Sequence, residues 1–184
     1  MKVSCFIESL LLFFLLSVAV VVDATNKDTS SSDDMMGFAD VRDIKIVTVA
    51  TGDQESPEAV DTDTKARLIL SIDAGLTHVD YILGIKDGED ITQAHLHCGH
   101  AGDTGPPVAF VLGTETTTAG IDIDGVASQG TLTNDNIMEQ ACGIDGLPVN
   151  NIASLFAAIR LGIIYVNVHS EEYPAGVVRG QLFI

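Results

Sequence analysis

The stretch Lys65-Ala-Arg-Leu-Ile-Leu-Ser-Ile72 decides the fold class of this chain. Its even-numbered positions are all apolar, while Lys65, Arg67 and Ser71 fall at odd positions between them. An alternation with a period of two puts one side of a β-strand in a core and the other side in solvent. The stretch therefore predicts a half-buried strand.

The same period continues outward from this strand. Residues 79–85 alternate in the same way, and Ala94 and Leu96 share one face of a third segment whose other face carries His95 and His97. Further β-like runs begin at residue 44 and cover residues 108–112, 130–133, 163–169 and 177–184. Turn signals rich in Gly, Asp and Pro separate the runs at residues 73–75, 87–88, 102–107, 124–125 and 174–176. Many short strands at close spacing predict an all-β sandwich or barrel.

Residues 151–161 follow the helical period instead. Apolar side chains recur at Ile152, Leu155, Phe156 and Ile159, which is the spacing of one helix face. Asn150 or Asn151 can cap the start, and Gly162 can end the helix. We therefore expect one short helix, packed on an end of the sandwich.

The first 24 residues are typical of a secretory signal peptide. Lys2 precedes an apolar run of 13 residues, 10–22, and Ala24 offers a cleavage site. A helix of that length spans ~20 Å, short of the ~30 Å that a membrane core requires, although an uncleaved anchor is the alternative. Residues 25–43 lack an apolar period and predict a flexible acidic lead-in, so the folded domain is expected over residues 44–184.

The charge of the chain excludes two classes of partner. It carries 26 acidic against 9 basic residues, a formal net charge of −17. A surface this acidic repels the phosphates of nucleic acids and of anionic lipids. We expect no nucleic-acid partner, and no membrane span once the signal peptide is removed.

Two cysteines remain after the leader, Cys98 and Cys142. In a secreted domain such a pair is expected to form a disulfide, and two buried free thiols are the alternative. A bridge enclosing roughly 45 residues would stabilise the fold by ~4 kcal/mol in the chain-entropy account.

Four groups of residues, in this order, resemble the chordin-type (CHRD) domain family. They are Thr51-Gly-Asp-Gln-Glu-Ser-Pro57; Ala94-His-Leu-His-Cys-Gly-His-Ala-Gly102 with Gly105-Pro106; Leu155–Ile159 with Tyr165-Val-Asn-Val-His-Ser170; and Pro174–Leu182. The resemblance covers nearly all of residues 44–184. It implies an immunoglobulin-like β-barrel with distant similarity to copper/zinc superoxide dismutases. The chain departs from the family at Val177 or Val178, where relatives usually carry an acid that could partner Arg179.

The histidines are the candidates for chemistry. His95 and His97 lie two apart on one predicted strand, so both rings project from the same face. His169 ends another predicted strand, and the three imidazoles together would suit zinc or copper. His100 is a weaker fourth candidate because it lies in a loop, and Cys98 should face the opposite side of the strand. The alternative is that the histidines only hydrogen-bond loops and carbonyls. Neutral imidazole is the form that binds metal, so we expect binding to weaken as the pH drops below about 6.

These observations predict a secreted, extracellular binding or structural module with an unknown protein or matrix partner. No catalysis is expected from it. The alternative is a metal-binding redox protein that resembles superoxide dismutase, with zinc or copper as its cofactor. That alternative needs further ligands for a second metal, and of the histidines only His78 and His100 remain to supply them.

Overall fold

The structure is a computed structural model that describes residues 43–114, 119–142 and 146–184. The predicted signal peptide and almost all of the predicted lead-in, residues 1–42, lie outside the described residues. The elements, in chain order, are β1 (Ile44–Ala50), the 3-10 turn η1 (Gly52–Gln54), β2 (Lys65–Ile72), β3 (His78–Cys98), β4 (Pro107–Leu112), β5 (Ile121–Thr133), the 3-10 turn η2 (Asn134–Asn136), β6 (Gln140–Cys142), β7 (Leu147–Val149), α1 (Ile152–Arg160), β8 (Ile164–Ser170) and β9 (Val178–Gln181).

The long strand β3 organises the fold, because it passes from one sheet into another. Its first part pairs with β2 on one side and with β5 on the other. Its last part pairs with β8 and β4. The change of partners follows Asp87 and Asp90, whose φ angles are 51° and 46°, and the pairing with β5 shifts register around them. The Asp87-Gly88 turn predicted from the sequence is therefore a bend within one strand, because bulges use the same left-handed residues as turns.

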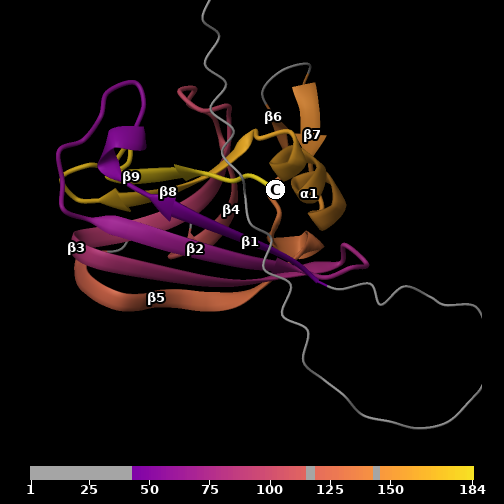
Figure 1. Cartoon of the computed structure of the whole chain (residues 1–184), viewed down its shortest axis with the longest axis horizontal. Helices are drawn as coiled ribbons and strands as arrows, with labels where there is room; N and C mark the ends of the chain where they lie inside the picture. The colour runs from indigo at the N-terminus through magenta and orange to yellow at the C-terminus, as the bar shows by residue number, and fades with distance from the viewer. Residues whose placement is uncertain (1–42, 115–118, 143–145) are drawn as a thin grey trace, which may run out of the picture. The chain divides into compact units, whose positions relative to one another are not determined.

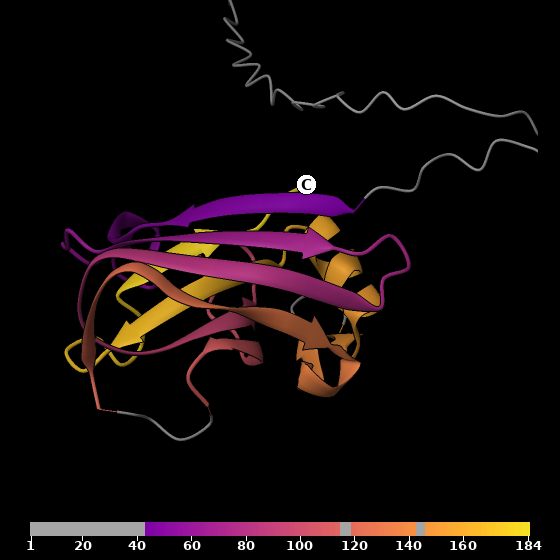
Figure 2. The same ribbon diagram turned by 90° about the horizontal axis from the view of Figure 1, so that it is seen from below.

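Hydrogen bonds join these strands into one antiparallel sheet of seven strands, and β6 and β7 form a separate sheet of two. The large sheet bends along β3 into two layers, called the two sheets below, which nearly close into a barrel. One contains β1, β2, the first part of β3 and β5; the other contains β4, the last part of β3, β8 and β9 (Figures 1 and 2). At the seam between β1 and β9, Thr51 and Arg179 exchange backbone hydrogen bonds of 3.0 and 3.2 Å. The Thr48 hydroxyl also donates to the Gln181 carbonyl at 2.8 Å. The predicted all-β fold with one short helix is confirmed.

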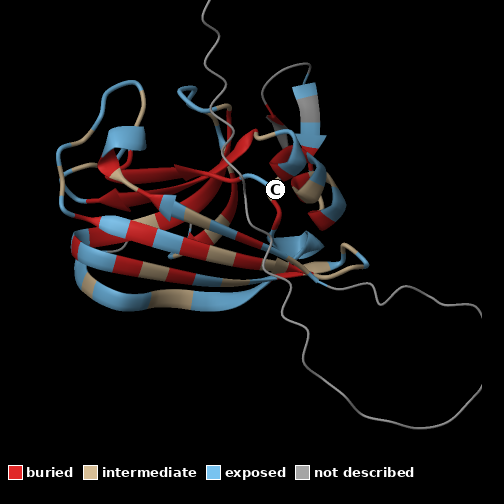
Figure 3. Ribbon diagram, viewed as in Figure 1, coloured by how far each residue is buried: buried red, intermediate tan, exposed pale blue. Residues whose placement is uncertain are grey.

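The two sheets bury their side chains differently. Buried and exposed residues alternate along β1 and β2, as the period of two predicts, and Figure 3 shows this as stripes. Every residue of β8 and β9 is buried, so these strands are covered on both sides. The inner sides meet in an apolar core that includes Leu68, Leu70, Ile72, Leu83, Ile85, Leu96, Ile164 and Leu182. The outer side of β8 and β9 is therefore a second buried layer.

The helix and the disulfide close one end of the domain. Asn151 caps α1 by accepting a hydrogen bond from the Ser154 amide at 2.8 Å, as predicted. Ile152, Leu155 and Ile159 are fully buried. Cys98 at the end of β3 is joined to Cys142 in β6, with their Cα atoms 5.1 Å apart. The described helices include none that is long and apolar enough to cross a membrane.

Two boundaries differ from those predicted. β5 begins at Ile121 rather than near residue 130 and runs through the predicted turn at Asp124-Gly125. Gly125 has a φ of 141°, which glycine can adopt because it lacks a Cβ. The strand therefore continues through Gly125 without reversing direction. The short strands β6 and β7 were not predicted, because three residues are too few to show a period.

Candidate metal site

The outer layer of the second sheet brings three histidines together. His95 and His97 lie on β3, and His169 lies on the neighbouring strand β8. His95 Nδ1 is 3.1 Å from His169 Nε2 and 3.3 Å from His97 Nε2. All three nitrogens lie within 4.8 Å of one another, and each residue is 8% exposed. The structure thus brings the three predicted ligands to one point.

Backbone carbonyls fix the orientation of two of these rings. His97 Nδ1 donates to the Gly105 carbonyl at 2.9 Å, and His169 Nδ1 donates to the Pro174 carbonyl at 3.0 Å. A carbonyl only accepts hydrogen bonds, so both neutral rings carry their proton on Nδ1 and a lone pair on Nε2. Both lone pairs therefore face the third ring. This is the arrangement in which metal-binding histidines are usually held.

The third ring, His95, is held mainly by packing. Phe110 meets it edge to face, with the ring centroids 4.4 Å apart. Its Nδ1 faces the other two histidines, while its Nε2 is buried without a hydrogen-bond partner. An unpaired buried nitrogen is costly, so the Nε2 atom of His95 is a polar atom that the fold leaves unsatisfied.

Burial keeps all three histidines neutral. Loss of solvation lowers the pKa of His95 to about 3 and that of His169 to about 4, and mutual repulsion between the imidazoles adds to both shifts. Burial also lowers the pKa of His97. The lowered pKa values favour the neutral form of these imidazoles, which is the form that binds a metal.

A cationic stack supports the site from one side. The ring of Tyr165 lies parallel to that of His97, with centroids 5.1 Å apart, and the Arg179 guanidinium lies 3.6 Å from the Tyr165 centroid. Arg179 is 2% exposed and donates to the carbonyls of Asp103 and His100, both at 2.7 Å. The Tyr165 hydroxyl accepts from the Gly105 amide at 3.1 Å. Together these groups hold residues 99–106, the loop whose Gly105 carbonyl orients His97.

Gly105 itself must lack a side chain. A Cβ at this position would overlap the carbonyl oxygen of Cys98. The close approach of the two backbone segments brings the Gly105 carbonyl to His97, so the glycine contributes directly to the geometry of the site.

Glu55 is a functional candidate that the sequence analysis did not single out. It follows η1, and burial raises its pKa to about 7, although Arg179 and hydrogen bonds from Ser56 and Asn167 oppose the shift. Its Oε1 is buried without a partner, as is Asn167 Oδ1. The sequence did contain an indication of its importance, because Glu55 lies in the Gln54-Glu55-Ser56-Pro57 group that resembles the family. The Glu55 carboxylate therefore interacts electrostatically with Arg179 from a distant loop, whereas Val177 and Val178 carry no carboxylate.

The other candidate residues lie outside the cluster. His100 lies in the loop, and its backbone carbonyl, rather than its ring, contacts Arg179. His78 begins β3 and lies 3.4 Å from the Asp73 carboxylate. Cys98 is in the disulfide, facing away from the histidines as predicted.

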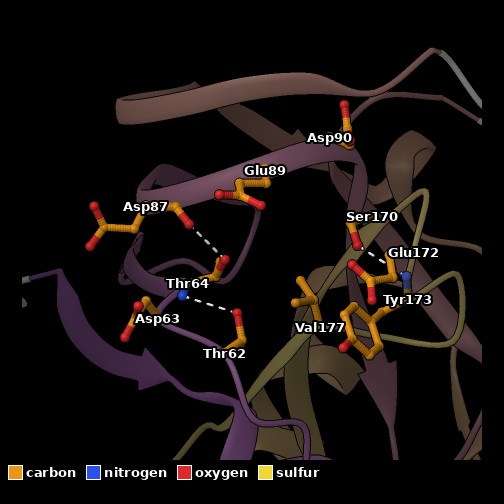
Figure 4. A pocket seen from close by; sticks show the side chains of 10 residues that line it. All are labelled: Thr62, Asp63, Thr64, Asp87, Glu89, Asp90, Ser170, Glu172, Tyr173 and Val177. Atoms are coloured by element: carbon orange, nitrogen blue, oxygen red, sulfur yellow. Dashed lines mark hydrogen bonds between the residues drawn. The ribbon is translucent and has the colours of Figure 1, made fainter.

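A separate cavity of about 470 Å³ is acidic but lacks the geometry of a metal site (Figure 4). Asp87, Glu89 and Asp90 reach it from β3, Asp63 from the segment before β2, and Glu172 from the segment after β8. Across the described residues, the three histidines alone bring three ligand atoms close enough to hold one ion.

The comparison with known families agrees with this architecture. Residues 46–182 match the family of CHRD domains. The chain belongs to the CHRD domain family. No curated protein and no solved structure matches it. CHRD domains occur in extracellular proteins, so this domain is, in coarse terms, an extracellular type of binding module.

Proposed function

We propose that this CHRD domain is a secreted binding module that holds one copper or zinc ion. The ligands are His95 through Nδ1 and His97 and His169 through Nε2. The observation that carries the proposal is the convergence of these three nitrogens while carbonyls hold the opposite N–H groups of two of the rings. Zinc and copper both accept imidazole ligands.

Proton accounting favours a metal over a purely structural role. The three inner nitrogens can share at most one proton, on His95 Nδ1, because the other two rings carry theirs on Nδ1, outside the cluster. One proton cannot make good hydrogen bonds to two lone pairs, and placing it there leaves His95 Nε2 without a donor. If the proton is on Nε2 instead, three lone pairs face each other. One metal ion would satisfy all three nitrogens.

Catalysis forms no part of the proposal. A two-metal site of the superoxide dismutase kind needs a second group of ligands, and the described part of the chain gathers only the three histidines in this way. We propose an extracellular protein or matrix component as the macromolecular partner of the CHRD domain.

Secretion is tested at the N-terminus of the released protein. The apolar run at residues 10–22 and the small residue Ala24 favour cleavage that leaves Thr25 as the first residue. Expression in a secreting host followed by N-terminal sequencing of the medium fraction should read Thr-Asn-Lys. A membrane-bound product that retains Met1 would contradict this part of the proposal.

Metal binding is tested with His97→Ala. The wild-type protein, loaded with zinc or copper and dialysed, should retain about one ion per chain by elemental analysis. The variant should retain less than about a tenth of that, because it loses the ligand that Gly105 orients. His78→Ala is the matched control, since that histidine lies outside the cluster and should leave the stoichiometry unchanged. Wild-type protein without metal, or full retention by His97→Ala, would refute the site.

A further inference from the structure

We propose that the three-histidine site selects monovalent copper, Cu(I), over the divalent ions Cu(II) and Zn(II). This inference rests on the proposed function and adds the charge of the ion to it. It follows from how little negative charge surrounds the three nitrogens and from how few donors they provide.

The ligands and their hydrogen-bond partners are all uncharged. Three imidazoles supply no negative charge, and the partners of His97 and His169 are the carbonyls of Gly105 and Pro174 rather than carboxylates. A buried ion keeps whatever charge its ligands do not neutralise, and buried uncompensated charge is expensive. A divalent ion here would leave two positive charges in the layer, whereas Cu(I) would leave one.

A buried charge that lies near the ligands is also positive. The Arg179 guanidinium lies against Tyr165, which stacks on His97, and this cation is 2% exposed. Among the described residues, the Glu55 carboxylate interacts electrostatically with Arg179. Burial raises the pKa of Glu55 to about 7, so it carries a full negative charge only above neutral pH. The field at the site therefore disfavours a second positive charge on the ion.

The number and surroundings of the donors point the same way. Zn(II) is usually four-coordinate, with four protein ligands in structural sites or three and a water in catalytic sites, whereas the cluster offers three buried nitrogens. Cu(I), a d¹⁰ ion of lower charge, is satisfied by three nitrogens. In the bound state His95 Nε2 carries its proton without an acceptor. A divalent ion would polarise that N–H group more strongly and leave it less satisfied.

The test compares three ions on one metal-free protein at pH 8. Cu(I) affinity is measured anaerobically by competition with bicinchoninate, and Cu(II) and Zn(II) affinities by competition with nitrilotriacetate. We expect Cu(I) to bind at least about 100-fold more tightly than either divalent ion. For copper this ratio places the potential of the bound couple about 120 mV above that of aqueous copper, at 59 mV per tenfold change.

A matched pair of variants tests the electrostatic cause. Glu55→Gln removes the carboxylate whose charge interacts with that of Arg179, so the preference for Cu(I) should rise about threefold to tenfold. Asp53→Asn removes an exposed carboxylate from the neighbouring turn and should leave the preference unchanged. Tighter binding of a divalent ion, or an unchanged preference in Glu55→Gln, overturns this inference and leaves the metal site standing. Failure to bind any of the three ions overturns the proposed function as well.

Discussion

Replacing Arg179 by methionine is expected to lower the free energy of unfolding by about 3–5 kcal/mol, the range for removing one member of a buried charged network. The guanidinium makes hydrogen bonds of 2.7 Å to the carbonyls of Asp103 and His100. Methionine fills a similar volume but donates nothing, so both carbonyls lose their partner and the loop at residues 99–106 loses its main tie to β9. Such charge-assisted bonds each contribute about 1.5–3 kcal/mol.

Urea denaturation of the metal-free protein measures this loss. Arg160→Met is the control, because Arg160 lies exposed on α1 with its guanidinium 6.0 Å from the Phe156 ring. That substitution should change the free energy of unfolding by less than about 1 kcal/mol. If Arg179→Met were no more destabilised than Arg160→Met, the guanidinium would not be anchoring the loop.

Acid should unfold the metal-free domain more readily than neutral solution does. The three histidines have lowered pKa values in the folded state, with His95 at about 3 and His169 at about 4, against 6.5 in the unfolded chain. Between about pH 4 and pH 6.5 these histidines therefore bind protons in the unfolded chain but remain largely unprotonated in the folded domain. Stability falls as the pH falls through this window.

Glu55 acts in the opposite direction. Its pKa is about 7 in the folded state and 4.5 in the unfolded chain, so on acidification the folded domain binds this proton before the unfolded chain does. The proton therefore stabilises the folded state at low pH, and this stabilisation is lost as the pH rises through 7. The unfolded chain gains about three protons on the histidines, and the folded domain gains about one on Glu55. The unfolded state therefore binds about two more protons than the folded state, and each changes the free energy of unfolding by about 1.36 kcal/mol per pH unit. We expect the free energy of unfolding to be about 3–5 kcal/mol lower at pH 4.5 than at pH 6.5.

Urea titrations across this range, with a chelator present, measure the slope. The His95→Gln variant lacks one of the titrating rings, so its slope should be shallower by about one proton. A flat profile in the wild-type protein would mean that the histidines titrate normally, and the cluster would then be solvated rather than buried.

The local parts of the fold could be predicted from the sequence. The alternation at residues 65–72 gave β2, and the cap at Asn151 gave the start of α1. The spacing of His95 and His97 placed both rings on one face, because side-chain direction along a strand depends only on parity. His169 joined them through the family resemblance rather than through any local pattern.

The remaining features depend on contacts between distant segments. Asp87 and Gly88 form a bend in β3 rather than a turn, since the partners that continue the strand, β8 and β4, come later in the chain. Glu55 and Arg179 act on each other across 124 positions, and both lie in segments without a useful period. The tautomers of His97 and His169 depend on carbonyls in two loops, which no spacing of side chains reveals.

The continuity of β3 determines how this CHRD domain can open to solvent. One sheet takes its third strand from the beginning of β3, and the other takes the strand that carries His95 and His97 from its end. Neither sheet can separate without releasing a strand that the other also uses, so the two halves should exchange their amide hydrogens through a shared opening event. An ion on the histidines would then slow amide exchange even in β2, which carries none of the ligands. Loss of that ion would loosen the whole domain rather than one edge of it.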